Sequence, residues 1–216
     1  RAVWHPEESD VFFRRVPVFY VRDVEGARPE RAVSSNDLIS VPDDFDPCGR
    51  FLLYSLESGN DVDLWVLELE SGVERPWLDE PYPERDGKFS PNGGWVAYGS
   101  TESGSSEIHV RSFPTGDERF VISGGGGRTP IWRHDGSELF YYSTDSEITA
   151  VPVTWTDGRP VFGRPASLFR VILRSGDHSF DVFPDGERFL LNRIVTETDE
   201  RSLVFVHGWQ RELESR

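Results

Sequence analysis

Three cationic or potentially cationic side chains share one position in a recurring sequence pattern, eight residues before a turn glycine. They are Arg85, Arg128 and His178. Arginine presents a planar fork of N–H donors that matches a carboxylate, and these groups stand in a chain whose formal net charge is −15. The sequence therefore predicts a site in which the three side chains hold a carboxylate-bearing ligand, such as the acidic end of a peptide. The alternative is that Arg85 and Arg128 form ion pairs with Asp43, Asp86 or neighbouring repeats.

The pattern that carries these residues consists of an aromatic or apolar residue, a turn of the Pro-x-Gly type and a short apolar run. It reads FDPCGRFLLY at 45–54, FSPNGGWVAY at 89–98, WRHDGSELFY at 132–141 and VFPDGERFLL at 182–191. The turn glycines are Gly49, Gly93, Gly136 and Gly186. A unit that returns roughly every 40 to 50 residues and is built from short strand signals is typical of a β-propeller.

These units divide the chain into five candidate blades within a single domain. Their approximate boundaries are 1–41, 42–84, 85–127, 128–171 and 172–216. One small sheet cannot cover both of its faces, whereas sheets packed around an axis can, so we expect an all-β propeller of about five antiparallel blades. We expect the first blade to be irregular, because Glu8 stands where the turn glycine belongs.

Two expectations concern segments outside the motif. In the fourth unit, a long outer connection is expected through Gly158, Pro160, Gly163 and Pro165. In the fifth unit only three strand signals are convincing, so we expect a strand from the N-terminal region, or from sequence upstream of it, to complete the last blade. The first residue is Arg rather than Met, which predicts a fragment or a processed form of a longer chain.

The propeller architecture places the predicted binding site at the axis. The first strand of each blade lines the axis, so the residues that enter these strands surround one mouth of the channel. By their distance from the turn glycines they are Val41, Arg85, Arg128 and His178, followed by Pro42, Asp86, Thr129 and Ser179. Phe45, Phe89 and Trp132 are expected to pack between neighbouring blades.

The composition limits the expected partners. The chain has 38 acidic against 23 basic residues, and such a surface repels phosphate backbones, so neither nucleic acid nor an anionic membrane is an expected partner. No apolar run approaches the roughly 18 residues that span a bilayer, so direct membrane insertion is not expected. The single cysteine, Cys48, excludes an intrachain disulfide.

Local motifs for catalysis, cofactors or metals are absent from the sequence. There is no G-x-S-x-G nucleophile elbow. The glycines at 124–127 are followed by RTPIW, which signals a strand and not the helix of a phosphate-binding loop. The five histidines lack ligand spacing, and Asp43, Asp44 and Asp46 lack the form of a calcium loop, so no cofactor or metal is predicted.

Several longer runs resemble a known family. FSPNGGWVAYGSTESGSSEIHVRSFP, GGGRTPIWRHDGSELFYYS and FDVFPDGERFLLN resemble the TolB-like, or WD40-like, β-propeller repeats of bacteria. The closing VFVHGWQREL is similar to the C-terminal end of propellers attached to some bacterial serine/threonine protein kinases and transcriptional regulators. The resemblance covers about residues 42–213. It implies a binding or scaffolding propeller, often outside the cytoplasm, with no catalytic residues to carry over.

Two functional hypotheses follow from the sequence. The first is a non-catalytic propeller that recognises a protein, a peptide or a small anionic ligand at its axial face. The second is a small propeller hydrolase or lyase with a metal or an acid/base pair at the channel mouth, since carboxylates from distant blades would leave no local signature. The absence of a local motif and the family resemblance favour the first hypothesis.

Overall fold

Every regular secondary-structure element among the described residues is a β-strand. The computed structural model describes residues 2–15, 18–33, 39–59, 61–173, 180–192 and 203–207. Their strands form five antiparallel sheets that follow the expected units in order. Within these ranges, no helix is long and apolar enough to cross a membrane.

The first three sheets are four-stranded meanders, here called blades 1 to 3. Blade 1 consists of β1 (Ala2–Trp4), β2 (Asp10–Arg15), β3 (Val18–Asp23) and β4 (Arg31–Ala32). Blade 2 consists of β5 (Ile39–Phe45), β6 (Phe51–Ser58), β7 (Asp61–Glu68) and β8 (Val73–Leu78). Blade 3 consists of β9 (Glu84–Phe89), β10 (Trp95–Ser100), β11 (Glu107–Ser112) and β12 (Arg119–Val121).

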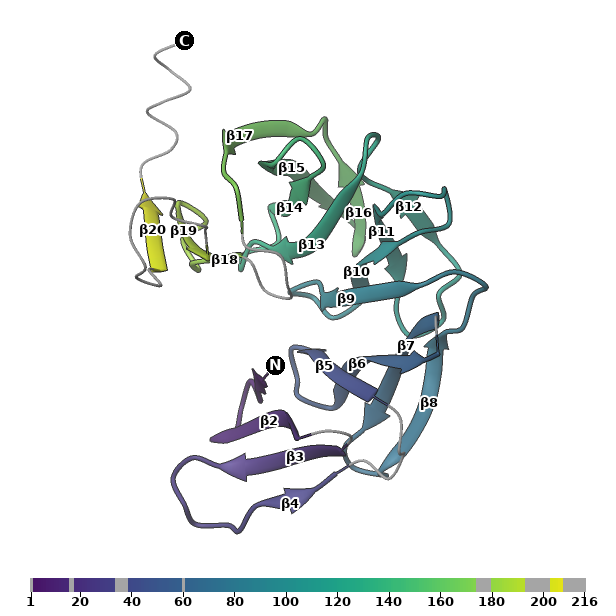
Figure 1. Ribbon diagram of the computed structural model, residues 1–216, viewed down its shortest axis with the longest axis vertical. Coiled ribbons are helices and arrows are strands. Elements are labelled where there is room, and N and C mark those ends of the chain that lie inside the picture. Colours follow the sequence, from purple (N-terminus) through teal and green to yellow (C-terminus); the bar gives the residue numbers. More distant parts are fainter. Residues whose placement is uncertain are drawn as a thin grey trace.

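The last two sheets depart from the four-stranded plan. Blade 4 consists of β13 (Gly127–Trp132), β14 (Glu138–Ser143), β15 (Glu147–Thr156), β16 (Arg159–Phe162) and β17 (Ala166–Arg170). Blade 5 consists of β18 (Phe180–Val182), β19 (Arg188–Asn192) and β20 (Leu203–His207). Figure 1 shows the five sheets following one another around an arc, which is open between blade 5 and blade 1. The first strands β5, β9 and β13 face the inside of this arc.

One hydrogen bond closes the turn between the first two strands in every blade. The backbone N–H of the residue after the aromatic or apolar motif residue donates to the carbonyl of the first residue of the second strand. The pairs, 2.8 to 3.0 Å long, are His5–Asp10, Asp46–Phe51, Ser90–Trp95, Arg133–Glu138 and Phe183–Arg188. In blades 2 to 5 the turn glycine has a positive φ, such as 67° at Gly49 and 74° at Gly136, which glycine adopts without steric cost. This shared register makes positions in different blades equivalent.

Equivalent positions build every interface between consecutive blades. The motif aromatics Phe45, Phe89 and Trp132 are 7%, 5% and 8% exposed and pack against the preceding blade, as the sequence predicts. The second residue of the second strand lies in the same interfaces and is fully buried. It is Leu52, Val96, Leu139 or Phe189. The residue after it packs against the following blade and is also fully buried in the inner blades, as Leu53, Ala97 and Phe140.

The expected outer connection of the fourth unit is wrong in part, because it contains two strands. β15 is ten residues long and pairs with β17 along its first half and with β16 along its second half. The β15–β16 hairpin extends back to blade 3, where the indole Nε1 of Trp95 donates to the carbonyl of Gly158 at 2.9 Å. The glycines and prolines of this segment therefore indicated a loop where β16 and β17 form. The β15–β16 hairpin connects blade 4 to blade 3.

The N-terminal strand does not complete the last blade. β1 pairs with β2 inside blade 1, and in the part of the chain that the structure describes no N-terminal strand pairs with β18, β19 or β20. Blade 1 differs from the others in its two-residue outer strand β4 and in Trp4, which occupies the place of the motif aromatic but is 63% exposed.

Leu53 and Leu190 test the equivalence of the blades, since both follow the interface residue of the second strand. Leu53 is fully buried between blades 2 and 3, whereas Leu190 on blade 5 is partly exposed. We expect Leu53→Ala to lower the free energy of unfolding by about 2–5 kcal/mol, because it leaves an enclosed cavity. Leu190→Ala should cost clearly less in the same urea denaturation experiment. Equal losses at the two positions would contradict this description of the interfaces.

Candidate axial binding site

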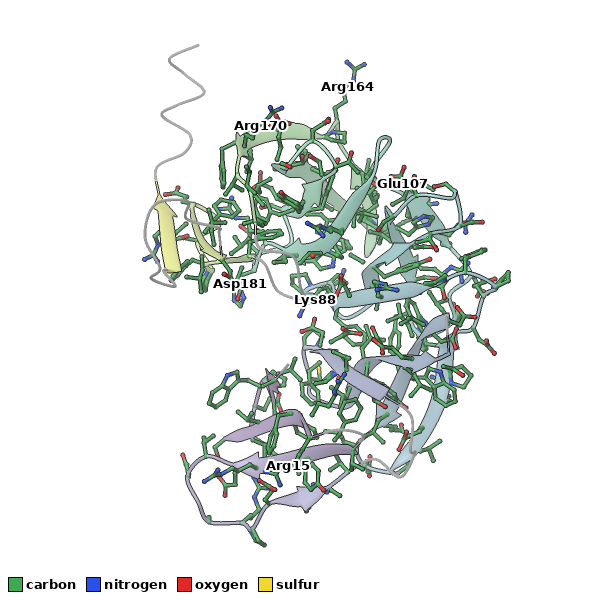
Figure 2. All side chains as sticks on the ribbon, in the orientation of Figure 1. Arg15, Lys88, Glu107, Arg164, Arg170 and Asp181 are labelled. Atoms are coloured by element: carbon green, nitrogen blue, oxygen red, sulfur yellow. The ribbon has the colours of Figure 1, made fainter. Side chains whose placement is uncertain are left out.

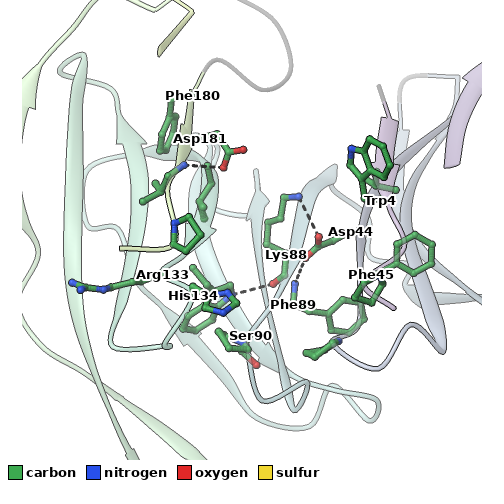
Figure 3. Close-up of a pocket in the computed structure, with 18 of the residues that line it drawn as sticks. Trp4, Asp44, Phe45, Lys88, Phe89, Ser90, Arg133, His134, Phe180 and Asp181 are labelled. Carbon is green, nitrogen blue, oxygen red and sulfur yellow. Dashed lines mark hydrogen bonds and ion pairs between the residues drawn. The ribbon is translucent and has the colours of Figure 1, made fainter. Parts of the chain in front are cut away.

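A central cavity of about 970 Å³ lies where the first strands of the blades converge. It is lined by residues of β1, β5, β9, β13 and β18, by the turns that follow these strands, and by two residues of β19. All five blades therefore contribute to one cavity, as the inner strands of a propeller should (Figure 3).

Lys88, the only lysine of the chain, carries a positive charge into this cavity. Its ammonium group donates to the carbonyl of Asp43 at 2.7 Å and lies 3.4 Å from a carboxylate oxygen of Asp44. The other carboxylate oxygen of Asp44 accepts from the backbone N–H of Phe89 at 2.9 Å. The carbonyl of Lys88 in turn accepts from the indole of Trp132 at 3.1 Å. These bonds fix a charged pair at the axis and connect blades 2, 3 and 4 (Figure 3).

The charged lining comes from a position that sequence reasoning missed. Four equivalent residues, five places before the turn glycine, line the cavity: Asp44, Lys88, Ile131 and Asp181. Three of these positions could have been predicted from the sequence. Asp44, Lys88 and Ile131 each directly precede an interface aromatic, and side chains alternate between the two faces of a strand. The residue before an interface aromatic must then point away from that interface.

The cavity combines an aromatic surface with exposed polar groups. Trp4 is 63% exposed and lies beside Asp44 and Lys88, while Asp181 and His134 are exposed on the opposite side (Figure 3). An exposed indole offers stacking area, and the carboxylates and imidazole offer hydrogen bonds. The arrangement is suited to holding a polar chain by contacts from several blades.

Arg85 and Arg128 occupy equivalent positions outside this cavity. Each is the second residue of an inner strand, β9 or β13, and both side chains are exposed. They stand at the start of those strands, whereas the cavity residues stand at the end, so the arginines lie toward the other mouth of the axis. The guanidinium of Arg128 lies 4.9 Å from the ring centre of Tyr142. Neither arginine has an ion pair among the residues that the structure describes. His178 lies outside the described residues.

A β-bulge follows each of the two arginines. Asp86 and Thr129 have φ values of 59° and 54°, in the left-handed region that side chains other than glycine seldom adopt. At both places the pairing with the second strand shifts register, between Ala97 and Gly99 of β10 in blade 3 and between Arg128 and Ile131 of β13 in blade 4. A bulge changes the direction of neighbouring side chains and is common beside functional sites. The same local geometry therefore presents both arginines.

A buried carboxyl group precedes Arg85. Glu84 is fully buried, and neither of its carboxylate oxygens has a hydrogen-bond partner among the described residues. Burial raises the pKa of Glu84 to about 8; the carboxylates of Glu80, Asp63 and Asp61 act in the same direction, and the guanidinium of Arg111 opposes them. Glu84 therefore favours its neutral form near pH 7.

Metal-binding geometry is not found in the described ranges. No three or more His, Cys, Asp or Glu side chains there are grouped in a way that would hold a metal ion. The buried groups Glu84 and His109 belong to the interior of blade 3 and do not line the cavity.

The protein is a β-propeller, since its antiparallel sheets pack face to face around a common cavity. No protein-family model and no curated protein sequence matches the chain. Its fold is similar to that of TolB from Acinetobacter baumannii, with a TM-score of 0.74 and 16% identity over 95% of this chain and 51% of TolB. The fold is thus that of the TolB-like propellers, and the chain spans about half the length of that TolB.

Other structures with a similar fold belong to proteins of different kinds, an enzyme and a complex between proteins. A puromycin-hydrolyzing peptidase from Mycobacterium tuberculosis gives a TM-score of 0.63 and 15% identity over 88% of this chain and 34% of the peptidase. A chain of the Nidogen/Laminin Complex gives a TM-score of 0.63 and 12% identity, with 89% and 70% of the two chains covered. At such identities the comparisons establish the fold, and this fold occurs both in an enzyme and in a complex between proteins.

The buried carboxyl group leads to a testable pH dependence. The pKa of Glu84 in the folded chain, about 8, lies above its usual 4.5, so the folded state binds this proton more tightly than the unfolded state. The contribution of Glu84 to stability must then fall as the pH rises from about 4.5 to about 8. Glu84→Gln, which cannot ionise, should be more stable than the parent at pH 9 and similar to it at pH 4.

The measurement is the difference in free energy of unfolding between the parent and Glu84→Gln across this pH range. Subtraction removes the titration of all other groups to first order. Glu57→Gln, at an exposed position of β6, serves as the control and should show a flat difference. A flat difference for Glu84→Gln as well would show that the Glu84 carboxyl ionises normally in the folded chain.

Proposed function

We propose that this propeller is a non-catalytic recognition module that binds a protein or peptide partner at its axial face. The partner presents a carboxylate, which Arg85 and Arg128 bind at the mouth of the axis, with His178 as a third cationic group. The observation that carries this proposal is the pairing of equivalent, exposed arginines on neighbouring blades, each followed by a β-bulge. Neither guanidinium is neutralised by an ion pair within the described residues, so both are available to a ligand.

Electrostatics supports a carboxylate ligand at this place. The chain has a formal net charge of −15, so an exposed arginine pair reverses the local sign of charge. Charge-assisted hydrogen bonds between guanidinium and carboxylate are stronger than neutral ones, and the planar fork makes them directional. A similar fold in the Nidogen/Laminin Complex is consistent with a role in protein recognition.

An enzymatic role finds less support. The fold is shared with a peptidase, but the identity of 15% carries no residue roles to this chain. The central cavity holds Asp44 in a pair with Lys88, which leaves Asp181 as its exposed carboxylate on an inner strand. Such an arrangement is better suited to binding than to acid/base chemistry, for which two carboxyl groups with separated pKa values would be needed.

The proposal is tested with a panel of acidic peptides, each prepared with a free C-terminal carboxylate and as the C-terminal amide. Binding is followed by fluorescence anisotropy at low salt. The parent chain should prefer the free carboxylate, and Arg85→Ala and Arg128→Ala should each weaken that binding by about tenfold, because one charge-assisted contact is lost. Arg164→Ala is the matched control, since Arg164 is exposed but points away from the molecule (Figure 2).

Binding that is equal for all four proteins would place the site elsewhere. Binding of the amides as strongly as the free acids would show that the carboxylate is not the recognised group. Either result would contradict the proposed role of the two arginines.

A further inference from the structure

The two exposed arginines differ in the residue that lies opposite each of them on the second strand. In blade 4, Arg128 pairs directly with Tyr142 of β14, whereas in blade 3 the equivalent Arg85 pairs with Gly99 of β10. Residues directly opposite each other in an antiparallel pair have their side chains on the same face of the sheet. Arg128 therefore has an aromatic ring beside it, and Arg85 has no side chain at the opposite position.

The ring of Tyr142 is fixed both by packing and by a hydrogen bond. It is 5% exposed and belongs to the apolar cluster between blades 4 and 5, together with Phe140 and Ile148. Its hydroxyl group donates to the carbonyl of Val171 at 3.0 Å. A buried aromatic ring whose polar end is also bonded offers a rigid surface to whatever lies against it.

The guanidinium of Arg128 lies over this rigid ring. Its central carbon is 4.9 Å from the ring centre, which is within the range of a cation–π attraction. A guanidinium group that contacts a ring in this way keeps N–H groups available for a carboxylate. Since the Arg128 side chain is exposed, those N–H groups can reach a ligand.

Arg85 has no comparable support. A methyl group on Gly99 would lie 3.9 Å from Cγ of Arg85, so the aliphatic part of the arginine passes over the glycine. Among the described residues, the guanidinium of Arg85 contacts no aromatic ring, in contrast to that of Arg128. The two equivalent arginines therefore differ in how strongly the fold orients their charged groups.

We propose that Tyr142 is a positioning residue of the carboxylate site, an inference that rests on the proposed function. Its ring holds the guanidinium of Arg128 in place before the ligand arrives, whereas Arg85 becomes ordered only when the ligand binds. A side chain that is already ordered loses less conformational freedom on binding, so the ring raises the affinity without touching the ligand. Arg128 is then the preorganised half of the site.

Affinity measurements on Tyr142 variants test the proposal. The probe is the acidic peptide with a free C-terminal carboxylate that the parent chain binds most tightly, followed by fluorescence anisotropy. Tyr142→Leu should raise the Kd by about threefold or more, because the ligand must then order Arg128 itself. Tyr142→Phe keeps the ring and should stay within about twofold of the parent. In the Arg128→Ala background, Tyr142→Leu should have no further effect, which a role in stability alone would not produce.

Tyr141→Leu is the matched control. Tyr141 is equally buried, at 5% exposure, but packs in the cluster between blades 3 and 4, so its loss should leave the affinity unchanged. If Tyr142→Leu binds the peptide as the parent does while Arg128→Ala weakens binding, the role of Tyr142 is overturned and the proposed function stands. If Arg128→Ala also binds as the parent does, both are overturned.

NMR spectroscopy of the unmodified, ligand-free chain keeps the proposal falsifiable if Tyr142→Leu does not fold. ¹⁵N relaxation should show that the side-chain Nε–H group of Arg128 is more ordered than that of Arg85. The Hε proton of Arg128 should also be shifted upfield by the ring current of Tyr142. Equal order of the two arginines without an upfield shift at Arg128 would overturn the proposal, even if both arginines contribute to binding.

Discussion

The constraint on which this structure depends is that each small sheet is apolar on both faces. A four-stranded sheet with Leu52 and Phe45 on one side and Leu53 on the other gains most of its stability only when neighbours cover both sides. Sheets that twist and pack face to face in series must curve around an axis. The axial cavity and its two mouths are consequences of this packing, and binding residues can vary there without loss of the interfaces.

Different residues therefore stabilise the fold and line the axial cavity. The interface residues are nearly invariant in character from blade to blade, whereas the equivalent axial residues Asp44, Lys88, Ile131 and Asp181 differ in charge and size. Arg85 and Arg128 likewise share their position with an apolar residue, Val41, in blade 2. An axial face built in this way offers a ligand a different side chain from every blade, and its specificity depends on those few positions.

The repeat made the fold largely predictable from the sequence. The turn glycines and the motif aromatics indicated the recurring turns and the interface residues of blades 2 to 4, because a positive φ and an interblade contact are both local requirements. The β16 and β17 strands were missed because Pro160 and Pro165 signal a loop, although an outer strand tolerates proline. The exposure of Trp4 depends on which blade packs beside it, and the raised pKa of Glu84 depends on burial by residues distant in the sequence. Neither property can therefore be predicted from the local sequence.

Native-state hydrogen exchange tests the central claim, that blade-on-blade packing holds the propeller together. The comparison is between three equivalent second strands, β10 with both faces covered and β2 and β19 with one face covered each. We expect that β10 amides exchange only through global unfolding, while those of β2 and β19 exchange through openings of lower free energy. Equal protection of all three strands would contradict it, because each blade would then be stable independently of its neighbours.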